Sequence, residues 1–229
     1  MAVPLMIYVT GVADPHVAFG TSAVAVATNA AANLARHAGE GNVRWDCAAV
    51  FSATGAVGAY SGSSLGKIVD GQQLLFLFAL LMLTVGTLVL IKGSGNGDVA
   101  TRLNWRNFPA LCVFGFAAGT ISGFFGIGGG FLITPSLMLV TGMPIVHAVG
   151  SSLVAVVTFG SMTAANYASS GYVDWVLASV FVIGGAPGGL LGVRCAKILS
   201  GKRCALNIIF ATLVFAVAIY ILLCDLISS

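Results

Sequence analysis

The chain has 229 residues, of which 58% are hydrophobic and only 7% are charged. A soluble globular domain carries about a quarter charged residues, so a soluble chain of this composition could not cover its surface. A lipid-facing surface needs no polar coat, and the composition therefore predicts an all-α, polytopic membrane protein. The net charge is only +3 and Lys and Arg form no run, which argues against nucleic acid as a partner.

Charges and turn residues divide the sequence into apolar segments, most of them about 18–21 residues long, the length of a membrane-spanning helix. The predicted segments are 1–11, 17–35, 45–65, 74–91, 108–125, 131–141, 148–168, 175–193 and 205–223. The first and the sixth are short, which is more typical of re-entrant or half-spanning helices. The polar stretch 92–107 contains Gly-Ser-Gly-Asn-Gly and predicts a linker between two halves.

The two halves of the chain resemble each other at a shift of 130 residues. Gly20-Thr21-Ser22 then aligns with Gly150-Ser151-Ser152, Trp45 with Trp175, and Lys67 with Lys197. Matched Gly, Trp and Lys in the same order are not expected by chance, so the sequence predicts a duplication of the kind found in secondary transporters. The chain divides into a first repeat (1–91), a linker (92–107) and a second repeat (108–229).

The first repeat is predicted to be incomplete at its N-terminus. Residues 108–130 have no counterpart in the first half, because the chain begins too late to contain one. Two explanations stay open: either the start codon is misplaced, or the gene lacks one element.

The positions of the ten Lys and Arg residues predict the topology, because these residues concentrate in cytoplasmic loops. If 108–141 crosses the membrane an even number of times, nine of the ten lie on one side and only Lys67 lies on the other. This segment is then a pair of helices or a re-entrant hairpin, and the short stretch 131–141 favours the hairpin. Lys67 and Lys197 fall on opposite faces, which predicts two inverted repeats. Each repeat is expected to contain a glycine-broken short helix pair and three transmembrane helices.

The stretch Gly-Phe-Phe-Gly-Ile-Gly-Gly-Gly-Phe-Leu-Ile-Thr-Pro at 123–135 carries the predicted site. Each glycine costs a helix about 1 kcal/mol relative to Ala, and a break at membrane depth is tolerated only where the backbone is buried in protein or lines a cavity. Free N–H groups at such a break, next to the N-terminus of the following helix, suit an anion. We therefore predict that Gly126, Gly128, Gly129 and Gly130 bind substrate.

The alternative is that glycines only permit close helix packing. That role is preferred for the glycines spaced four apart, because packing requires this spacing and not a run. These glycines are 58, 62 and 66, then 115, 119 and 123, and finally 184, 188 and 192.

Polar side chains inside the spans supply further candidates. The hydroxyls of Thr21-Ser22 and Ser151-Ser152 open a predicted helix in each half, where they either cap the helix or donate to a bound oxyanion. The amides Asn29, Asn33 and Asn166 are expected to bond between helices, with substrate contact as the second alternative. The sequence contains neither a mid-span carboxylate, a nucleophile–base pair nor a metal-binding motif. We therefore predict no proton relay, enzyme activity, metal or cofactor.

These motifs resemble one known family. The glycine-rich run, the Gly-Ser-Ser sequence at 150–152 and the Gly-Tyr-Val-Asp-Trp loop at 171–175 are similar to the sulfite exporter TauE/SafE family, also described as the 4-toluene sulfonate uptake permease family. Val3-Pro4, 20–22 and 41–45 repeat the pattern, so the likeness covers nearly the whole chain. The glycine-rich element that members carry before Val3-Pro4 is absent here. The resemblance implies transport of sulfite, organosulfonates or related small sulfur-containing anions.

The sequence as a whole predicts a multi-pass secondary transporter of the cell membrane, a permease or exporter, whose partners are a small anion and the lipid bilayer. A homo-oligomer is one alternative for its assembly. A passive anion channel and a non-transporting membrane scaffold subunit are the alternative functions. The predicted substrate-binding residues are Gly126, Gly128, Gly129, Gly130, Thr134, Pro135, Ser151 and Ser152, together with Pro4, Thr21, Ser22 and Asn33 from the first half.

Overall fold

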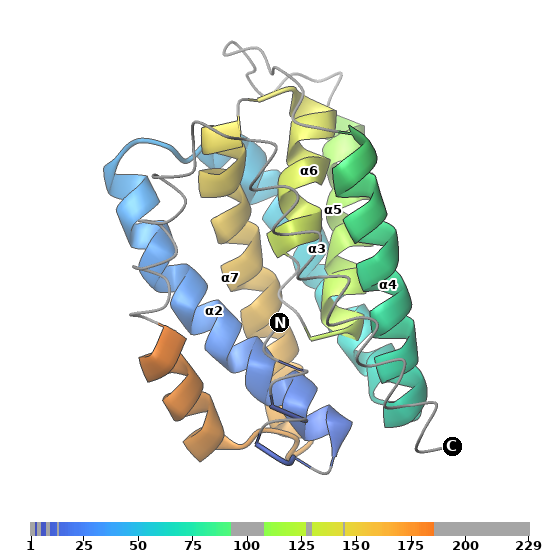
Figure 1. Cartoon of the computed structure of the whole chain (residues 1–229). Helices are drawn as coiled ribbons and strands as arrows, with labels where there is room; N and C mark the ends of the chain where they lie inside the picture. The colour runs from blue at the N-terminus through green and yellow to red at the C-terminus, as the bar shows by residue number, and fades with distance from the viewer. Residues whose placement is uncertain are drawn as a thin grey trace. The chain divides into compact units, whose positions relative to one another are not determined.

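The computed structural model describes residues 3, 6–7, 10–12, 14–92, 108–126, 130–143 and 145–185, and these contain helices and no strands. The helices are α2 (Pro15–Gly39), α3 (Trp45–Gly66), α4 (Gly71–Lys92), α5 (Phe108–Phe124), α6 (Gly130–Thr141) and α7 (Ile145–Ser169), followed by a helix at Trp175–Gly185 (Figure 1). The predicted linker after Lys92, the rest of the 175–193 segment and the segment 205–223 lie outside the described residues.

The predicted apolar segments coincide with helices α2 to α7, and their ends agree within four residues. The predicted start of α2, at residue 17, is two residues later than its observed start at Pro15. Asp14 is the N-cap of this helix, where its carboxylate accepts a hydrogen bond of 2.8 Å from the His16 N–H, and Pro15 opens the first turn. An Asp-Pro pair signals the start of a helix through its polar cap and its proline, so the distribution of hydrophobic residues does not reveal it.

Two of the described helices are long and apolar enough to cross a membrane, by length and composition. They are Pro15–Gly39, with a mean hydropathy of 1.2, and Val146–Ser169, with 1.5. At a rise of 1.5 Å per residue the 25 residues of α2 extend about 37 Å, more than the ~30 Å of a hydrocarbon core. The 12 residues of α6 extend only about 18 Å, which is too short to cross.

The chain packs as two compact units, which are described separately. One comprises 1–68 and 96–182, and contains α2, α3, α5, α6 and α7; the other comprises 69–95 and 183–229, and contains α4. Each unit takes residues from both predicted repeats, so the repeat boundary at 92–107 stays a prediction.

In the first unit α7 packs against α2, α3 and α6, and α3 also packs along α5 (Figure 1). The residue contacts define the relative directions of these helices. Phe159 and Tyr167 of α7 lie against Gly55 and Gly66 of α3 in the same order along both helices, so α3 and α7 are parallel. The start of α2 lies against the end of α7, so α2 and α7 are antiparallel. The core contains Phe51, Leu111, Ile133, Leu137, Val156 and Phe159.

Glycines bring α3 and α5 into close contact. A Cβ atom at Gly119 or Gly123 would overlap the carbonyl of Gly55 or Ala59, and one at Gly62 would overlap that of Thr120. At Gly58, Gly66 and Gly115 a Cβ atom would also come too close to an opposing carbonyl, that of Phe116, Phe124 and Phe51 respectively. The packing role predicted for glycines spaced four apart is therefore confirmed for these six. No described atom lies within 4 Å of a Cβ at Gly184, and residues 188 and 192 lie outside the described part.

Candidate functional site

The helix break predicted in the glycine-rich stretch is present. Helix α5 ends at Phe124, Phe125 and Gly126 form a turn, and α6 begins at Gly130 and runs back along α7. Gly126 has φ +57°, a left-handed conformation that disfavours other residues. Its N–H donates to the Gly123 carbonyl at 3.2 Å, so this amide is not free for an anion. Gly128 and Gly129 lie outside the described residues.

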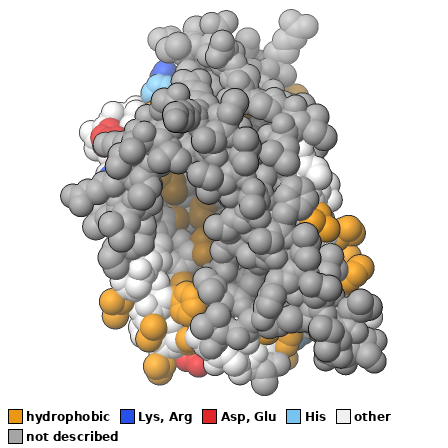
Figure 2. Space-filling model, viewed as in Figure 1, with side chains coloured by type: hydrophobic (Ala, Val, Ile, Leu, Met, Phe, Trp, Pro, Cys, Tyr) orange, Lys and Arg blue, Asp and Glu red, His pale blue; other side chains and the backbone are white. Residues whose placement is uncertain are grey.

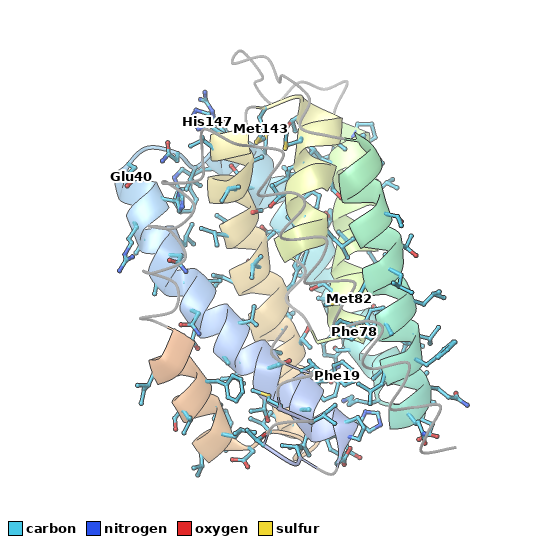
Figure 3. The ribbon with its side chains drawn as sticks, viewed as in Figure 1. Phe19, Glu40, Phe78, Met82, Met143 and His147 are labelled. Atoms are coloured by element: carbon cyan, nitrogen blue, oxygen red, sulfur yellow. The ribbon has the colours of Figure 1, made fainter. Side chains whose placement is uncertain are left out.

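The first end of the break lies against the N-terminal part of α2. The Ser22 hydroxyl, whose side chain is 1% exposed, lies 3.0 Å from the Gly126 carbonyl and 2.9 Å from the Phe19 carbonyl, and donates to them. A Cβ atom at Gly126 would lie 2.8 Å from the Phe19 carbonyl. Figure 3 labels Phe19 near the start of α2, and His147 near the start of α7 at the other end of the unit.

The second end of the break lies against α7. Thr134 Oγ1 is 3.0 Å from Ser152 Oγ, and it also donates to the Gly130 carbonyl at 3.0 Å. Ser152 in turn donates to the Val149 carbonyl at 2.8 Å. A Cβ atom at Gly130 would lie 3.3 Å from Val156 Cγ2, so little space separates α6 from α7 here. The break is therefore flanked by Ser22 and Ser152, which are 130 residues apart.

The prediction that these hydroxyls open their helices is wrong. Because α2 begins at Pro15 and α7 at Ile145, residues 20–22 and 150–152 lie inside the helices and past the positions that cap them. The capping alternative is thereby excluded. The hydroxyls are placed instead where the helix contacts another segment.

Thr21 and Ser151 dock the loop that follows the opposite helix. Thr21 Oγ1 accepts a hydrogen bond of 3.0 Å from the Asp174 N–H, and Ser151 Oγ accepts one of 2.9 Å from the Arg44 N–H. Both side chains are fully buried. The glycine before each of them, at 20 and 150, makes room for the carbonyl of Tyr172 and of Asn42 respectively. In the structure these two predicted site residues therefore each hold a loop by a hydrogen bond, and their role in substrate binding stays a prediction.

The amides do not share one role. Asn33 and Asn29 donate at 3.0 Å to carbonyls four residues earlier on α2, an alternative that helix geometry offers to short polar side chains. Asn166 bonds between helices as expected: its amide nitrogen lies 2.6 Å from Ser63 Oγ and 2.9 Å from Ser64 Oγ. The Pro135 side chain and Pro4 lie outside the described part.

Lys67, which the sequence predicts to lie in a loop, joins α3 to α7 through its ammonium group. Lys67 Nζ lies 2.8 Å from Asn166 Oδ1, 3.2 Å from the Asn166 carbonyl and 2.9 Å from Ser170 Oγ, so three acceptors match its three N–H groups. Its place directly after an apolar segment is the one available signal, because a lysine at a helix end can fold its aliphatic stem back along the protein.

The part of the chain that the structure describes brings no three His, Cys, Asp or Glu side chains together as a metal site. What the geometry offers is backbone and hydroxyl groups around a helix break. Such groups bind and orient a solute, and the first N–H groups of α6 lack partners within that helix.

Comparison with known proteins identifies the family. The model of the family described as "Sulfite exporter TauE/SafE" matches residues 1–221. The chain belongs to the sulfite exporter TauE/SafE family.

Relatives of this TauE/SafE protein carry transporter names. It is 47% identical over 226 residues to a "Probable membrane transporter protein" of Xylella fastidiosa (strain 9a5c), covering 97% of this chain and 85% of the relative. It is 26% identical over 186 residues to the "Probable membrane transporter protein YdhB" of Bacillus subtilis (strain 168), covering 80% and 76%. No solved structure matches significantly. The protein is thus a member of a membrane transporter family, as predicted.

Proposed function

We propose that this TauE/SafE protein is a multi-pass secondary transporter of the cell membrane that moves small sulfur-containing anions, such as sulfite or organosulfonates. The observation that carries the proposal is the helix break between α5 and α6, whose two ends contact Ser22 of α2 and Ser152 of α7. The substrate class is supported by the family description. The relatives in Xylella fastidiosa and Bacillus subtilis described above are named probable membrane transporter proteins.

An anion at this break would be held by neutral dipoles. Helix α6 begins at Gly130, and the positive end of its dipole, with the N–H groups of its first turn that have no partner within the helix, attracts negative charge. The hydroxyl of Thr134 lies one turn after Gly130 along α6, next to the hydroxyl of Ser152 on α7. In a site of low dielectric constant such groups interact strongly with an anion.

We further propose that the two halves are inverted repeats. Two contacts support this: Thr21 accepts from the loop after α7, and Ser151 accepts from the loop after α2. The acceptors Thr21 and Ser151 are 130 residues apart, and so are the donors Arg44 and Asp174. Helices α2 and α7 are also antiparallel. Two repeats related by an axis in the membrane plane provide two equivalent states and hence alternating access.

The exposed apolar surface of the first unit supports several spans. Val57 of α3, Val113 of α5 and Val176 of the following helix are 61%, 66% and 75% exposed. Figure 2 shows hydrophobic side chains with few charged ones among the described residues on the face it presents. Apolar side chains exposed along several adjacent helices are expected where those helices contact lipid.

The test is sulfite flux into proteoliposomes that contain the purified protein. Saturable flux is expected, and Gly129→Leu should abolish it by filling the break. Thr134→Val and Ser152→Ala should raise the KM. The control is Thr28→Val, which removes an exposed hydroxyl that bonds only its own helix.

Two other results would contradict the proposal. A conductance that does not saturate with sulfite concentration would identify a channel, and absence of flux from a well-folded sample would identify a scaffold subunit.

A further inference from the structure

Four buried hydroxyl groups of the first unit have no hydrogen-bond partner among the described residues. One is Ser52 of α3, and the other three, considered next, belong to Ser122 of α5 and to Thr163 and Tyr167 of α7. Their side chains are 0%, 1% and 0% exposed respectively. Buried hydroxyl groups are nearly always paired, so three unpaired ones require an explanation.

The same helices contain hydroxyls that pair in the ordinary way. Thr120 of α5 donates to the Phe116 carbonyl, and Thr158 of α7 donates to the Val154 carbonyl, each at 2.9 Å. This bond to the preceding turn is open to any helical Ser or Thr. Ser122 and Thr163 do not make it, so their hydroxyls point elsewhere.

Ser122 and Thr163 lie at the same level of the unit. Their positions along the helix axes can be compared through α3, because Gly55 of α3 lies against both Gly119 of α5 and Phe159 of α7. Ser122 follows Gly119 by three residues, and Thr163 follows Phe159 by four, which in parallel helices is about one turn in the same direction.

Both residues also face the same core. Leu111 and Ala118 occupy the side of α5 that carries Ser122, and Val156 and Phe159 occupy the side of α7 that carries Thr163. All four belong to one hydrophobic cluster.

Tyr167 connects this level to the helix break. Its Cβ lies beside Gly20 of α2, and its hydroxyl lies beside Gly66 at the end of α3, 3.1 Å from the position of a Cβ there. The carbonyl of Phe124, the last residue of α5, lies 2.6 Å from that same position. The Tyr167 hydroxyl is therefore next to the point where α5 ends and the break begins.

We propose that the hydroxyls of Ser122, Thr163 and Tyr167 donate hydrogen bonds to the oxygens of an oxyanion bound beside the α5–α6 break. This subsite rests on the proposed transport function and extends it to residues outside the glycine-rich stretch. Three O–H donors fit a solute such as sulfite, which carries several acceptor oxygens. The described carboxylates lie in loops or at helix ends, so none is available to accept hydrogen bonds from these hydroxyls.

The test is thermal unfolding of the purified full chain in detergent, with sodium sulfite or with sodium chloride at equal ionic strength. Sulfite should raise the midpoint of the wild-type protein. Tyr167→Phe, Thr163→Val and Ser122→Ala should each weaken the apparent sulfite affinity roughly tenfold or more, because each removes a hydrogen bond to a charged group. Without sulfite their midpoints should equal or exceed that of the wild type, since each removes an unpaired buried hydroxyl.

Ser52→Ala is the matched control. Ser52 is also buried and unpaired, but on α3 it lies about two turns from the level of Ser122, and its substitution should leave the sulfite response unchanged. A sulfite response that all four variants retain, or that the wild type lacks, would overturn the subsite. So would lower midpoints in the three variants with an unchanged sulfite response, which would identify structural water.

Sulfite flux separates this proposal from the transport function. Saturable flux with the same KM in all four variants would overturn the subsite alone. Sulfite binding that depends on the three hydroxyls, without flux in liposomes, would overturn the transport function alone.

Discussion

The identity of single residues decides how closely the helices of this protein approach one another. At Gly126 the left-handed conformation and the nearby Phe19 carbonyl both exclude a Cβ atom. At Lys67 a cation is held by neutral oxygens at the ends of two helices, where the helix dipoles favour positive charge. These contacts are specific enough to be tested one at a time.

We predict that Lys67 and Asn166 act as one stabilising unit. Lys67→Met should lower the free energy of unfolding by about 1–3 kcal/mol, because it removes the ammonium donor of the buried Asn166 Oδ1. Asn166→Leu should cost a similar amount, and the double variant should cost little more than either single one. Thermal unfolding of the four proteins in detergent forms the double-mutant cycle. Strictly additive losses would show that the two side chains do not interact.

Among the elements, α3 and α5 depend most on small residues. We expect Gly119→Leu to destabilise the protein by about 1–3 kcal/mol or more, because its side chain would overlap the Gly55 backbone. The matched control is Gly39→Ala at the end of α2, where no described atom lies within 4 Å of the new Cβ and helix propensity favours Ala. Equal unfolding midpoints for the two variants would mean that α3 and α5 do not pack in this way.

The helices were more predictable from sequence than the site. Their bounds follow from where charges and turn residues interrupt apolar segments. The predicted starts of α2, α4 and α7 are two to three residues late, and for α2 the signal that was not used is the Asp14-Pro15 cap. The break at Gly126 to Gly130 was predictable because glycine runs disfavour helix. The roles of Thr21 and Ser151 were not, because their partners are loop N–H groups 153 and 107 residues away in sequence. The unpaired hydroxyls of Ser122 and Thr163 were not predictable either, because the direction of a hydroxyl depends on packing and not on residue type.

For the whole molecule, the inverted-repeat proposal makes a prediction about sidedness. Glu40, after α2, and its repeat equivalent Ser170, after α7, should lie on opposite faces of the membrane, because α2 and α7 are antiparallel. Single Glu40→Cys and Ser170→Cys variants, in a background without the five native cysteines, should react with a membrane-impermeant thiol reagent from opposite sides. Labelling of both from the same side of sealed vesicles would contradict the inverted topology.

The transport function itself is tested most directly by counterflow. Proteoliposomes loaded with unlabelled sulfite are diluted into a trace of labelled sulfite, and the label inside is followed with time. An alternating-access carrier exchanges internal for external substrate, so we predict transient accumulation of label above its external concentration. Accumulation should disappear in Gly129→Leu vesicles. Label that only equilibrates, or that never enters vesicles containing folded protein, would contradict the account.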